Sequence, residues 1–519
     1  MRKRLAWAAA LAGAAVCLFY CYLLQARTGA VTSDAAANAL QAADMLHGNW
    51  LLHGWWLSDV SFYTTELPEY ILVEWVHGLR PDDVHICAAI TYTLLVLLTA
   101  LVARGTARGR EGIVRALLAG GIMVAPEIGQ STNTLLGSPD HTGTGVPVML
   151  TLLVLDRIRP RWYLPPVIFI LLTWVQVADQ LATVAVAAPI ALVCGFRAAM
   201  WLLPGRRVAA GWYDLSLAVV AIASVAVAHQ LLAVIHDHGG FYVHPLPGGL
   251  FVTSVSALPH RGTILGLCVL ILFGANLARQ VPGLAMGVAA LHLAGLALAA
   301  VGLLEGIWHF FLKQADRVTQ LLVAGTLATL AAGWLGTHLN SAFDAHEIAI
   351  VLPLGAALAG RLLGGPIARA RVAGPAVLGA VLAAYLAALG FACAQPKQPA
   401  ANEQLAGWLV AHHLTSGLGG YWQAESVTLD TGGTVIVAQI YGDNPYSWEA
   451  KSGWYDPATS YANFVVMVSG PPAQSVFARP AVILRAFGRP AHTYTFQQYT
   501  IMVWNKNLLP ELEPFGTVN

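Results

Sequence analysis

The stretch MRKRLAWAAALAGAAVCLFYCYLLQARTGAVTSDAAANALQ (1–41) decides the fold class of this chain. Three basic residues precede an apolar run that begins at Leu5 and extends to Leu24. A run of this length can cross a bilayer, because a helical span needs about 20 residues. It is long for a signal peptide, and QARTG (25–29) is a poor cleavage site, so we expect a retained first membrane span.

A polar stripe follows this span. Asp34, Asn38 and Gln41 fall on one narrow side of a helix at 3.6 residues per turn, and apolar residues occupy the opposite side. The Asp34 carboxylate, at the outer end of a span, can accept a proton from an attacking hydroxyl. Alternatively, Ser33 or Asp34 only caps the helix. The two carboxamides favour a ligand-facing stripe, because a cap alone does not require them.

The composition of the whole chain agrees with a membrane protein. The 519 residues are 57% hydrophobic and 11% charged, whereas soluble domains carry roughly 25% charged residues. The net charge of +1 gives no indication of a nucleic-acid partner. All six cysteines lie in or beside apolar segments, which argues against a disulfide framework and a cysteine-based zinc site.

Apolar stretches recur along most of the chain, near 5–25, 86–103, 113–126, 145–155, 163–178, 180–196, 213–235, 263–278, 283–304, 318–336, 345–360 and 374–393. Basic residues gather at the N-terminus and in four loops, which we assign to the cytoplasm. Five stretches separate the basic loops 197–207 and 361–371, so either one of them is re-entrant or interfacial, or one contains an unrecognised break. We predict about 11 to 13 spans, with the N-terminus in the cytoplasm and the C-terminal region outside.

The predicted fold class is mainly α: a polytopic α-helical membrane protein with a small C-terminal extracytoplasmic α/β domain. The transmembrane domain is expected at 1–396, with a large first extracytoplasmic loop at 29–84 that contains a juxtamembrane helix. The C-terminal domain is expected at 397–519.

Local patterns define the elements of this C-terminal domain. NEQLAGWLVAHHL (402–414) has helical periodicity, and SVTLDTGGTVIVAQIYG (426–442) suggests a hairpin around two glycines. NFVVMVSG (463–470) and HTYTFQQYTIMVW (492–504) are further strand candidates.

Several candidate binding residues lie in the predicted outer loops. In the first loop, Asp59 and Glu66 lie among aromatic residues, which either anchor the loop in the headgroup layer or stack on a sugar ring. Asp140 and His141 end the second outer loop, and Asp179 lies between two short spans near the outer face. An acid at membrane depth is a functional candidate, although Asp179 can equally cap the next helix.

Cations and histidines in later loops offer phosphate or metal sites. Arg261, Lys313 and His346 can hold a lipid phosphate, and the two longer side chains can equally extend to headgroups without selectivity. HDHGGFYVH (236–244) has a spacing that fits a divalent metal, although such clusters in wet loops often bind nothing. We therefore expect no obligatory cofactor, with a divalent metal as an open alternative.

Three segments carry a resemblance to the GT-C membrane glycosyltransferases: SDAAANALQAADMLHGNW (33–50), LPEYILVEWVHGL (67–79) and AHEIAIVLPLGAALAGR (345–361). The Ala-, Gly- and Leu-rich chain also resembles polytopic proteins of high-GC actinobacteria. It departs from the family in two places. Many members carry two adjacent acids where this chain has only Asp34, and His346 replaces a late arginine.

The resemblance implies a transferase that uses a polyprenyl-phosphate sugar at the outer face of the membrane. Asp34 would take the proton from an acceptor hydroxyl on a glycan, lipid or protein as it attacks the anomeric carbon. Arg261, Lys313 or His346 would balance the charge of the departing lipid phosphate. The donor lipid explains the membrane architecture, because removing it from the bilayer costs about 0.8 kcal/mol per buried CH₂.

Two other functions fit the sequence less well. A transporter or flippase would need polar groups near the midplane and usually paired repeats, and no repeat is visible. A non-catalytic envelope scaffold would bind glycan through the aromatic, Gly-rich loops at 417–430 and 444–457. We expect the scaffold to tolerate Asp34→Asn and the transferase not to.

Overall fold

The computed structural model describes residues 2–202, 208–245, 251–252, 254–280, 283–312, 314–370, 372–468 and 477–516. The chain divides into two compact units. The first comprises Met1–Gly29, Ala88–Leu231 and Leu246–Lys397, and the second comprises Ala30–Cys87, Leu232–Pro245 and Gln398–Asn519. The segment 30–87, which covers most of the predicted first outer loop, and the C-terminal region therefore belong to the same unit.

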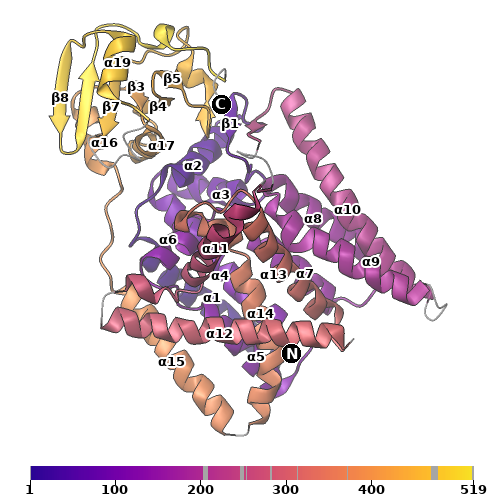
Figure 1. Cartoon of the computed structure of the whole chain (residues 1–519). Helices are drawn as coiled ribbons and strands as arrows, with labels where there is room; N and C mark the ends of the chain where they lie inside the picture. The colour runs from indigo at the N-terminus through magenta and orange to yellow at the C-terminus, as the bar shows by residue number, and fades with distance from the viewer. Residues whose placement is uncertain are drawn as a thin grey trace. The chain divides into compact units, whose positions relative to one another are not determined.

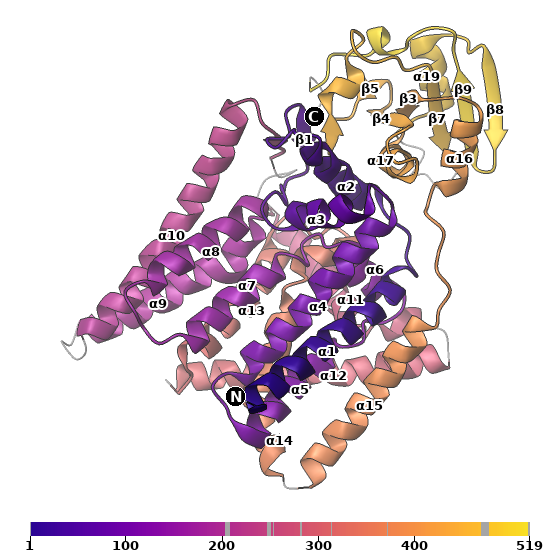
Figure 2. The ribbon, with the colours of Figure 1, turned by 180° about the vertical axis from the view of Figure 1, so that it is seen from behind.

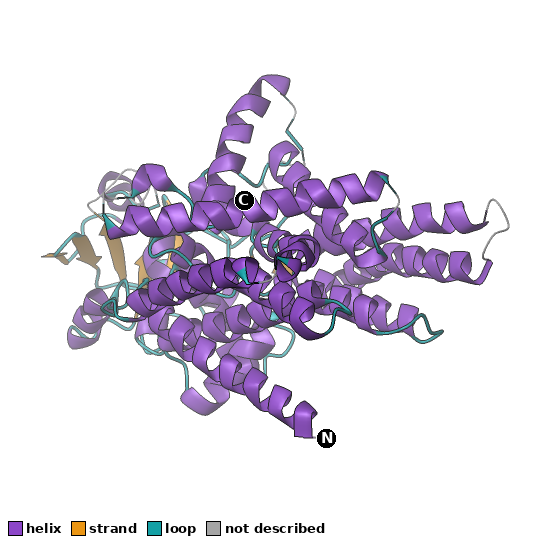
Figure 3. Ribbon diagram, turned by 90° about the horizontal axis from the view of Figure 1, so that it is seen from below, coloured by secondary structure: helices purple, strands orange, loops and turns teal. Residues whose placement is uncertain are grey.

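Helices build the first unit, as Figures 1 and 3 show. Among the described residues, nine helices belong to its membrane-length segments, and two of them continue into the second unit: α1 (Arg2–Ala26), α4 (Asp82–Arg104), α9 (Ala188–Leu202), α10 (Val208–Asp237), α11 (Leu258–Leu272), α12 (Leu284–Phe311), α13 (Arg317–Leu335), α14 (Val351–Arg369) and α15 (Ala373–Cys393). Of these, α9 and α11 have 15 residues each and reach that length because they continue η1 and η2. The shorter ones are α5 (Gly109–Met123), α6 (Gln130–Leu136), α7 (Gly145–Arg157), α8 (Leu164–Ala178), η1 (Thr183–Ala187), η2 (Val255–Ala257), η3 (Leu277–Arg279) and η4 (Ala342–Ile348).

Each apolar stretch predicted from the sequence coincides with a helix. Within the described residues, nine helical segments are long and apolar enough to cross a membrane. The predicted number is higher because it includes α5, α7 and α8, which have 15, 13 and 15 residues. The chain is a multi-pass membrane protein with the mainly α fold that the composition predicts.

The helix α12 differs from its neighbours in direction. Figure 1 shows it running across α13 and α14 rather than along them. Small residues permit close packing at this crossing. A Cβ atom at Gly302 would lie 2.6 Å from the backbone nitrogen of Ala359, so only glycine fits there.

A small three-stranded sheet ties the second unit together, with strand order β2-β1-β6. Its strands are β1 (Trp55–Leu57), β2 (Tyr242–Val243) and β6 (Ala450–Lys451). They come from three distant segments of the chain, β1 pairing parallel with β2 and antiparallel with β6. Asp44 adds an ion pair, because the Lys451 Nζ lies 2.9 Å from its Oδ1. The first outer loop thus contains part of the C-terminal fold.

Two helices of the first outer loop complete this region: α2 (Ser33–Leu46) and α3 (Glu66–His77). α2 begins after Thr32, whose hydroxyl accepts a hydrogen bond from the Ala35 amide. Neither Ser33 nor Asp34 is therefore the N-cap. Eleven of the 14 residues of α2 are buried, so this helix lies inside the unit rather than on its surface.

The C-terminal region folds around a mixed six-stranded sheet of order β5-β4-β3-β7-β9-β8 (Figure 2). Its strands are β3 (Ser416–Gly419), β4 (Ile436–Tyr441), β5 (Asn444–Pro445), β7 (Phe464–Val468), β8 (His492–Phe496) and β9 (Tyr499–Val503). The helical elements are α16 (Glu403–Ala411), α17 (Tyr421–Asp430), α19 (Pro480–Phe487), η5 (Ser452–Tyr455) and η6 (Leu509–Glu511).

Both faces of the central strands β3, β4 and β7 are buried, and their side chains alternate between the two faces. Val465 packs with Ile483 and Phe487 of α19 on one face, and Val466 packs with residues of α16 and α17 on the other. The predicted helix at 402–414 and the strands at 463–470 and 492–504 are confirmed by α16, β7, β8 and β9.

The predicted hairpin at 426–442 is wrong. Its first half is the helix α17, and only the second half is a strand. The reason is topological, because β3 and β4 are parallel neighbours and such a pair needs a crossover connection. α17 supplies this crossover, and the two glycines with positive φ, Gly432 and Gly433, end it.

Candidate functional site

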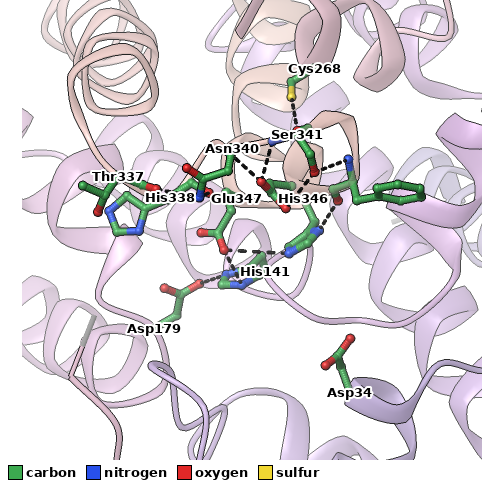
Figure 4. Close-up of polar contacts among 12 residues, drawn as sticks. Asp34, His141, Asp179, Cys268, Thr337, His338, Asn340, Ser341, His346 and Glu347 are labelled. Carbon is green, nitrogen blue, oxygen red and sulfur yellow. Dashed lines mark hydrogen bonds and ion pairs between the residues drawn. The ribbon is translucent and has the colours of Figure 1, made fainter. Parts of the chain in front are cut away.

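A histidine cluster lies in the first unit, where three segments meet. His141 precedes α7, Asp179 follows α8, and His346 and Glu347 lie in η4. Figure 4 shows the two imidazoles and the Glu347 carboxylate directed toward one another. The structure therefore brings together three residues that the sequence singled out separately, namely His141, Asp179 and His346.

Asp179 anchors this cluster. Its Oδ2 lies 3.0 Å from His141 Nδ1 and accepts a hydrogen bond of 2.5 Å from the Thr144 hydroxyl. Its Oδ1 accepts the amide hydrogen of Leu181 at 2.8 Å. Burial alone would raise the pKa of Asp179, but the charge and hydrogen bonds of His141 and Thr144 hold that pKa below its usual value. The carboxyl is thus an ionised, fully buried anchor for the imidazole.

Local backbone geometry fixes the cluster. His141 has a φ of 55°, in the left-handed region that non-glycine residues rarely adopt and that concentrates at functional sites. The segment η1, just after Asp179, is a single π-helical turn, a distortion also frequent at such sites. At the third segment, Ser341 and Asp344 form a capping box that starts η4.

The cluster has the donor set of a divalent metal site. Ligand atoms of His141, His346 and Glu347 all lie within 4.8 Å of one another. Each imidazole Nε2 is 3.8 Å from the Glu347 Oε1. The Nδ1 atoms are held by other oxygens, at 3.0 Å by Asp179 and at 2.9 Å by the Phe343 carbonyl. This arrangement directs both Nε2 atoms toward the Glu347 carboxylate, which is the donor set of two-histidine, one-carboxylate zinc sites.

A second cluster lies within the second unit, around Tyr421 at the start of α17. Its hydroxyl oxygen lies within hydrogen-bond distance of the Asp34 Oδ1 and, at 2.8 Å, of the Glu449 Oε2, and it donates its single hydrogen to one of the two carboxylates at a time. The Ser33 hydroxyl donates to the Tyr421 carbonyl at 2.7 Å, which fixes α2 against α17. Burial, and then the charges of Asp34 and Glu449, raise the pKa of Tyr421 well above its usual value. The phenol therefore stays protonated and orients the half-buried Asp34 carboxylate.

The rest of the predicted polar stripe is buried. Asn38 and Gln41 are each 1% exposed, and the Gln41 Oε1 has no hydrogen-bond partner within the described residues. Glu66 is also buried, and its Oε2 accepts a hydrogen bond from the Thr65 hydroxyl. Asp59 lies partly buried after β1.

The remaining predicted residues stand apart from the histidine cluster or cannot be placed. The Arg261 guanidinium donates to the Leu339 carbonyl at 2.7 Å and to the Asn340 Oδ1 at 3.1 Å, so it holds the loop before η4. Asp140 precedes His141 but is not one of the grouped metal-ligating residues. Lys313 lies outside the described residues.

The histidine-rich loop at 236–244 does not form the metal site. Among the described residues, the grouped ligands are those of the His141 cluster. His244 instead stacks on Trp448 with ring centroids 5.5 Å apart, and its Nε2 lies 3.3 Å from the Ser447 carbonyl. Burial lowers the pKa of His244, as expected for an imidazole packed among aromatic rings.

Three further functional candidates are residues to which the sequence reasoning assigned no role: Glu347, Tyr421 and Glu449. Glu347 is adjacent to His346, and pairing these two with the earlier His141 would have indicated a metal site. Tyr421 and Glu449 belong to aromatic loops in the expected C-terminal domain. Their link to Asp34, 387 residues away from Tyr421, leaves no local pattern in the sequence.

The fold has solved counterparts. ArnT from Cupriavidus metallidurans in the apo state matches with a TM-score of 0.57 and 11% identity, covering 99% of this chain and 100% of that chain. The chain has the fold of ArnT. ArnT bound to undecaprenyl phosphate matches with a TM-score of 0.50 and 12% identity, over 96% and 98% of the two chains.

A looser likeness, with a TM-score of 0.47 and 12% identity, relates the chain to the apo oligosaccharyltransferase of Archaeoglobus fulgidus, over 88% and 69% of the two chains. No protein-family model and no curated protein sequence matches this chain.

Proposed function

We propose that this protein is a membrane glycosyltransferase of the GT-C type. It moves a sugar from a polyprenyl-phosphate donor to an acceptor hydroxyl at the outer face of the bacterial cytoplasmic membrane. Asp34 is the general base. In this orientation the N-terminus is cytoplasmic and the C-terminal region lies outside.

One observation carries the proposal: the fold of ArnT extends over 99% of this chain, and a structure of ArnT contains undecaprenyl phosphate. A helical membrane protein with this fold has a physical reason to take a polyprenyl donor, since the lipid tail remains in the bilayer throughout the reaction. The cluster around Tyr421 contains the carboxylate of Asp34, which can accept a proton, and the histidine cluster contains imidazoles, which can balance a negative charge.

The proposed reaction is a single displacement at the anomeric carbon. The acceptor oxygen forms a bond to this carbon while the bond from the carbon to the phosphate oxygen breaks. The electron pair of that bond leaves with the polyprenyl phosphate, and the acceptor proton passes to Asp34. The Tyr421 hydroxyl, which donates to Asp34 and has a raised pKa, holds this carboxylate in place without competing for the proton.

The leaving phosphate carries negative charge that needs a positive partner. We assign this role to the cluster of His141, His346 and Glu347, either through the imidazoles or through a divalent cation held by them. A cation there would act as a Lewis acid for the phosphate oxygen. Arg261 is a further candidate for the phosphate, because its two described hydrogen bonds leave other donors of its guanidinium group available.

The proposal is tested by incubating the protein, reconstituted in lipid nanodiscs, with a panel of radiolabelled polyprenyl-phosphate pentoses and hexoses. We expect one donor to be consumed and polyprenyl phosphate to be released. A parallel sample in sealed vesicles measures movement of the labelled lipid between leaflets. Consumption of none of the donors, or leaflet movement without bond cleavage, would overturn the proposal.

A further inference from the structure

Aromatic side chains gather beside the Asp34 carboxylate in the second unit. The ring of Tyr446 lies 5.8 Å from that of Tyr421 and 5.6 Å from that of Phe477. Tyr441 lies 5.8 Å from Phe477, and Trp422 lies 5.1 Å from Tyr421. The five rings form one contiguous group, which we call the aromatic cluster.

The aromatic cluster runs from a buried base to an exposed rim. Tyr421, at the base, is 4% exposed, whereas Tyr441 and Trp422 are 53% and 39% exposed. Exposed aromatic rings cost hydration free energy, and a contiguous group of them marks a binding surface more often than scattered apolar residues do. A folding core would bury the largest rings first, yet here the outer rings are left open to solvent.

The hairpin that carries two of these rings is held rigidly. β4 ends at Tyr441, and β5 precedes Tyr446, so the tight turn at Gly442 places both rings together. Gly442 has a φ of 68°, and its amide donates to the Phe477 carbonyl at 2.6 Å. Rings fixed in this way lose little conformational freedom when a ligand stacks on them.

Two carboxylates lie at the base of the aromatic cluster. Asp34 and Glu449 both contact the Tyr421 hydroxyl. The ring of Tyr446 lies 5.8 Å from that of Tyr421, whose hydroxyl contacts both acids, and burial followed by the charges of Glu449 and Asp34 raises the pKa of Tyr446 to about 12. Paired carboxylates repel anionic ligands and accept hydrogen bonds from hydroxyl groups.

Aromatic faces above hydroxyl acceptors match the two surfaces of a sugar ring, its C–H face and its hydroxyl edge. We infer that the aromatic cluster binds a neutral saccharide, and that this saccharide is the acceptor of the transfer. The second half of this statement rests on the proposed function. The acceptor is then a glycan rather than a protein or a simple lipid, because a saccharide bound to these rings has its hydroxyl groups near Asp34, the proposed base.

The experiment is calorimetric titration of the full chain in nanodiscs with neutral oligosaccharides of pentose and of hexose units, without any donor. Tyr441→Ala removes the most exposed ring, and we expect about a tenfold weaker Kd, as for one lost aromatic contact. Tyr441→Phe keeps the ring and is expected to bind like the wild type. Tyr461→Ala is the matched control, because Tyr461 is 55% exposed in the same unit and lies outside the aromatic cluster.

The outcomes separate this inference from the proposed function. Saccharide binding that Tyr441→Ala weakens and Tyr461→Ala preserves supports the binding site, even if no donor is ever consumed. Absence of binding by every saccharide, or equal binding by Tyr441→Ala and wild type, overturns the site even where donor consumption is observed. Binding of a Ser/Thr-rich peptide that Tyr441→Ala abolishes, with no saccharide binding, also overturns it.

Discussion

The Asp179→Asn substitution should destabilise the protein measurably, because Asp179 is a buried anion with three hydrogen bonds. Asparagine keeps the acceptor for the Leu181 amide but presents an NH₂ group to His141 and Thr144, both of which donate to the Oδ2 atom in the wild type. Breaking a buried charged pair costs about 3–5 kcal/mol, and the retained amide contact puts the expected loss near the lower end, about 3 kcal/mol. For a chain of 519 residues, that loss corresponds to a fall of about 3 °C in apparent Tm.

The assay is scanning fluorimetry of nanodisc-embedded protein at a fixed scan rate, because membrane proteins often unfold irreversibly. Thr144→Val is the graded control. It removes one neutral donor and leaves the charge of Asp179, so a loss of about 1 kcal/mol is expected. An Asp179→Asn protein with the same Tm as the wild type, or one no less stable than Thr144→Val, would refute the account of Asp179 as the anchor of the cluster.

Three further predictions concern pH, packing and metal. Burial, and then the Asp83 charge, raise the pKa of Glu74 to about 9. The folded state therefore holds a proton that the unfolded state releases above about pH 4.5. The apparent Tm should fall as pH rises toward 9, and less steeply in Glu74→Gln; equal slopes would contradict this. Gly302→Val should lower the yield of folded protein, whereas Gly287→Val on the same helix, where a Cβ meets nothing within 4 Å, should not; matching yields would refute the close packing of α12. Elemental analysis after zinc equilibration should find about one zinc per wild-type chain and much less in Glu347→Gln, and equal contents would exclude Glu347 as a ligand.

The sequence predicts the positions of the membrane helices well, because apolar runs are a local signal. It does not predict α12 as the helix of different direction, since its direction depends on close contacts of glycines such as Gly302 with another helix. The β propensity of 426–430 is overridden by the parallel pairing of β3 and β4, a relation between strands that no local window contains.

The sequence predicts several residues of the candidate site, but it does not predict how they are arranged in space. Asp34, His141, Asp179 and His346 each stand out as polar groups beside apolar runs. Their partners are separated along the chain. His141 and Asp179 are 38 residues apart, because His141 lies just before α7 and Asp179 lies just after α8. The capping alternative for Asp34 is removed by one structural detail, the Thr32 hydroxyl that takes the N-cap position.

The role of Asp34 as the catalytic base is tested most directly by the single-turnover rate of sugar transfer in Asp34→Asn. The matched control is Asp456→Asn, an exposed acid in the same unit whose carboxylate accepts hydrogen bonds from Ala458 and Thr459 of its own turn. We expect Asp34→Asn to transfer sugar about 100-fold to 10,000-fold more slowly than the wild type, with Asp456→Asn unchanged. Transfer by Asp34→Asn at the wild-type rate would contradict the mechanism.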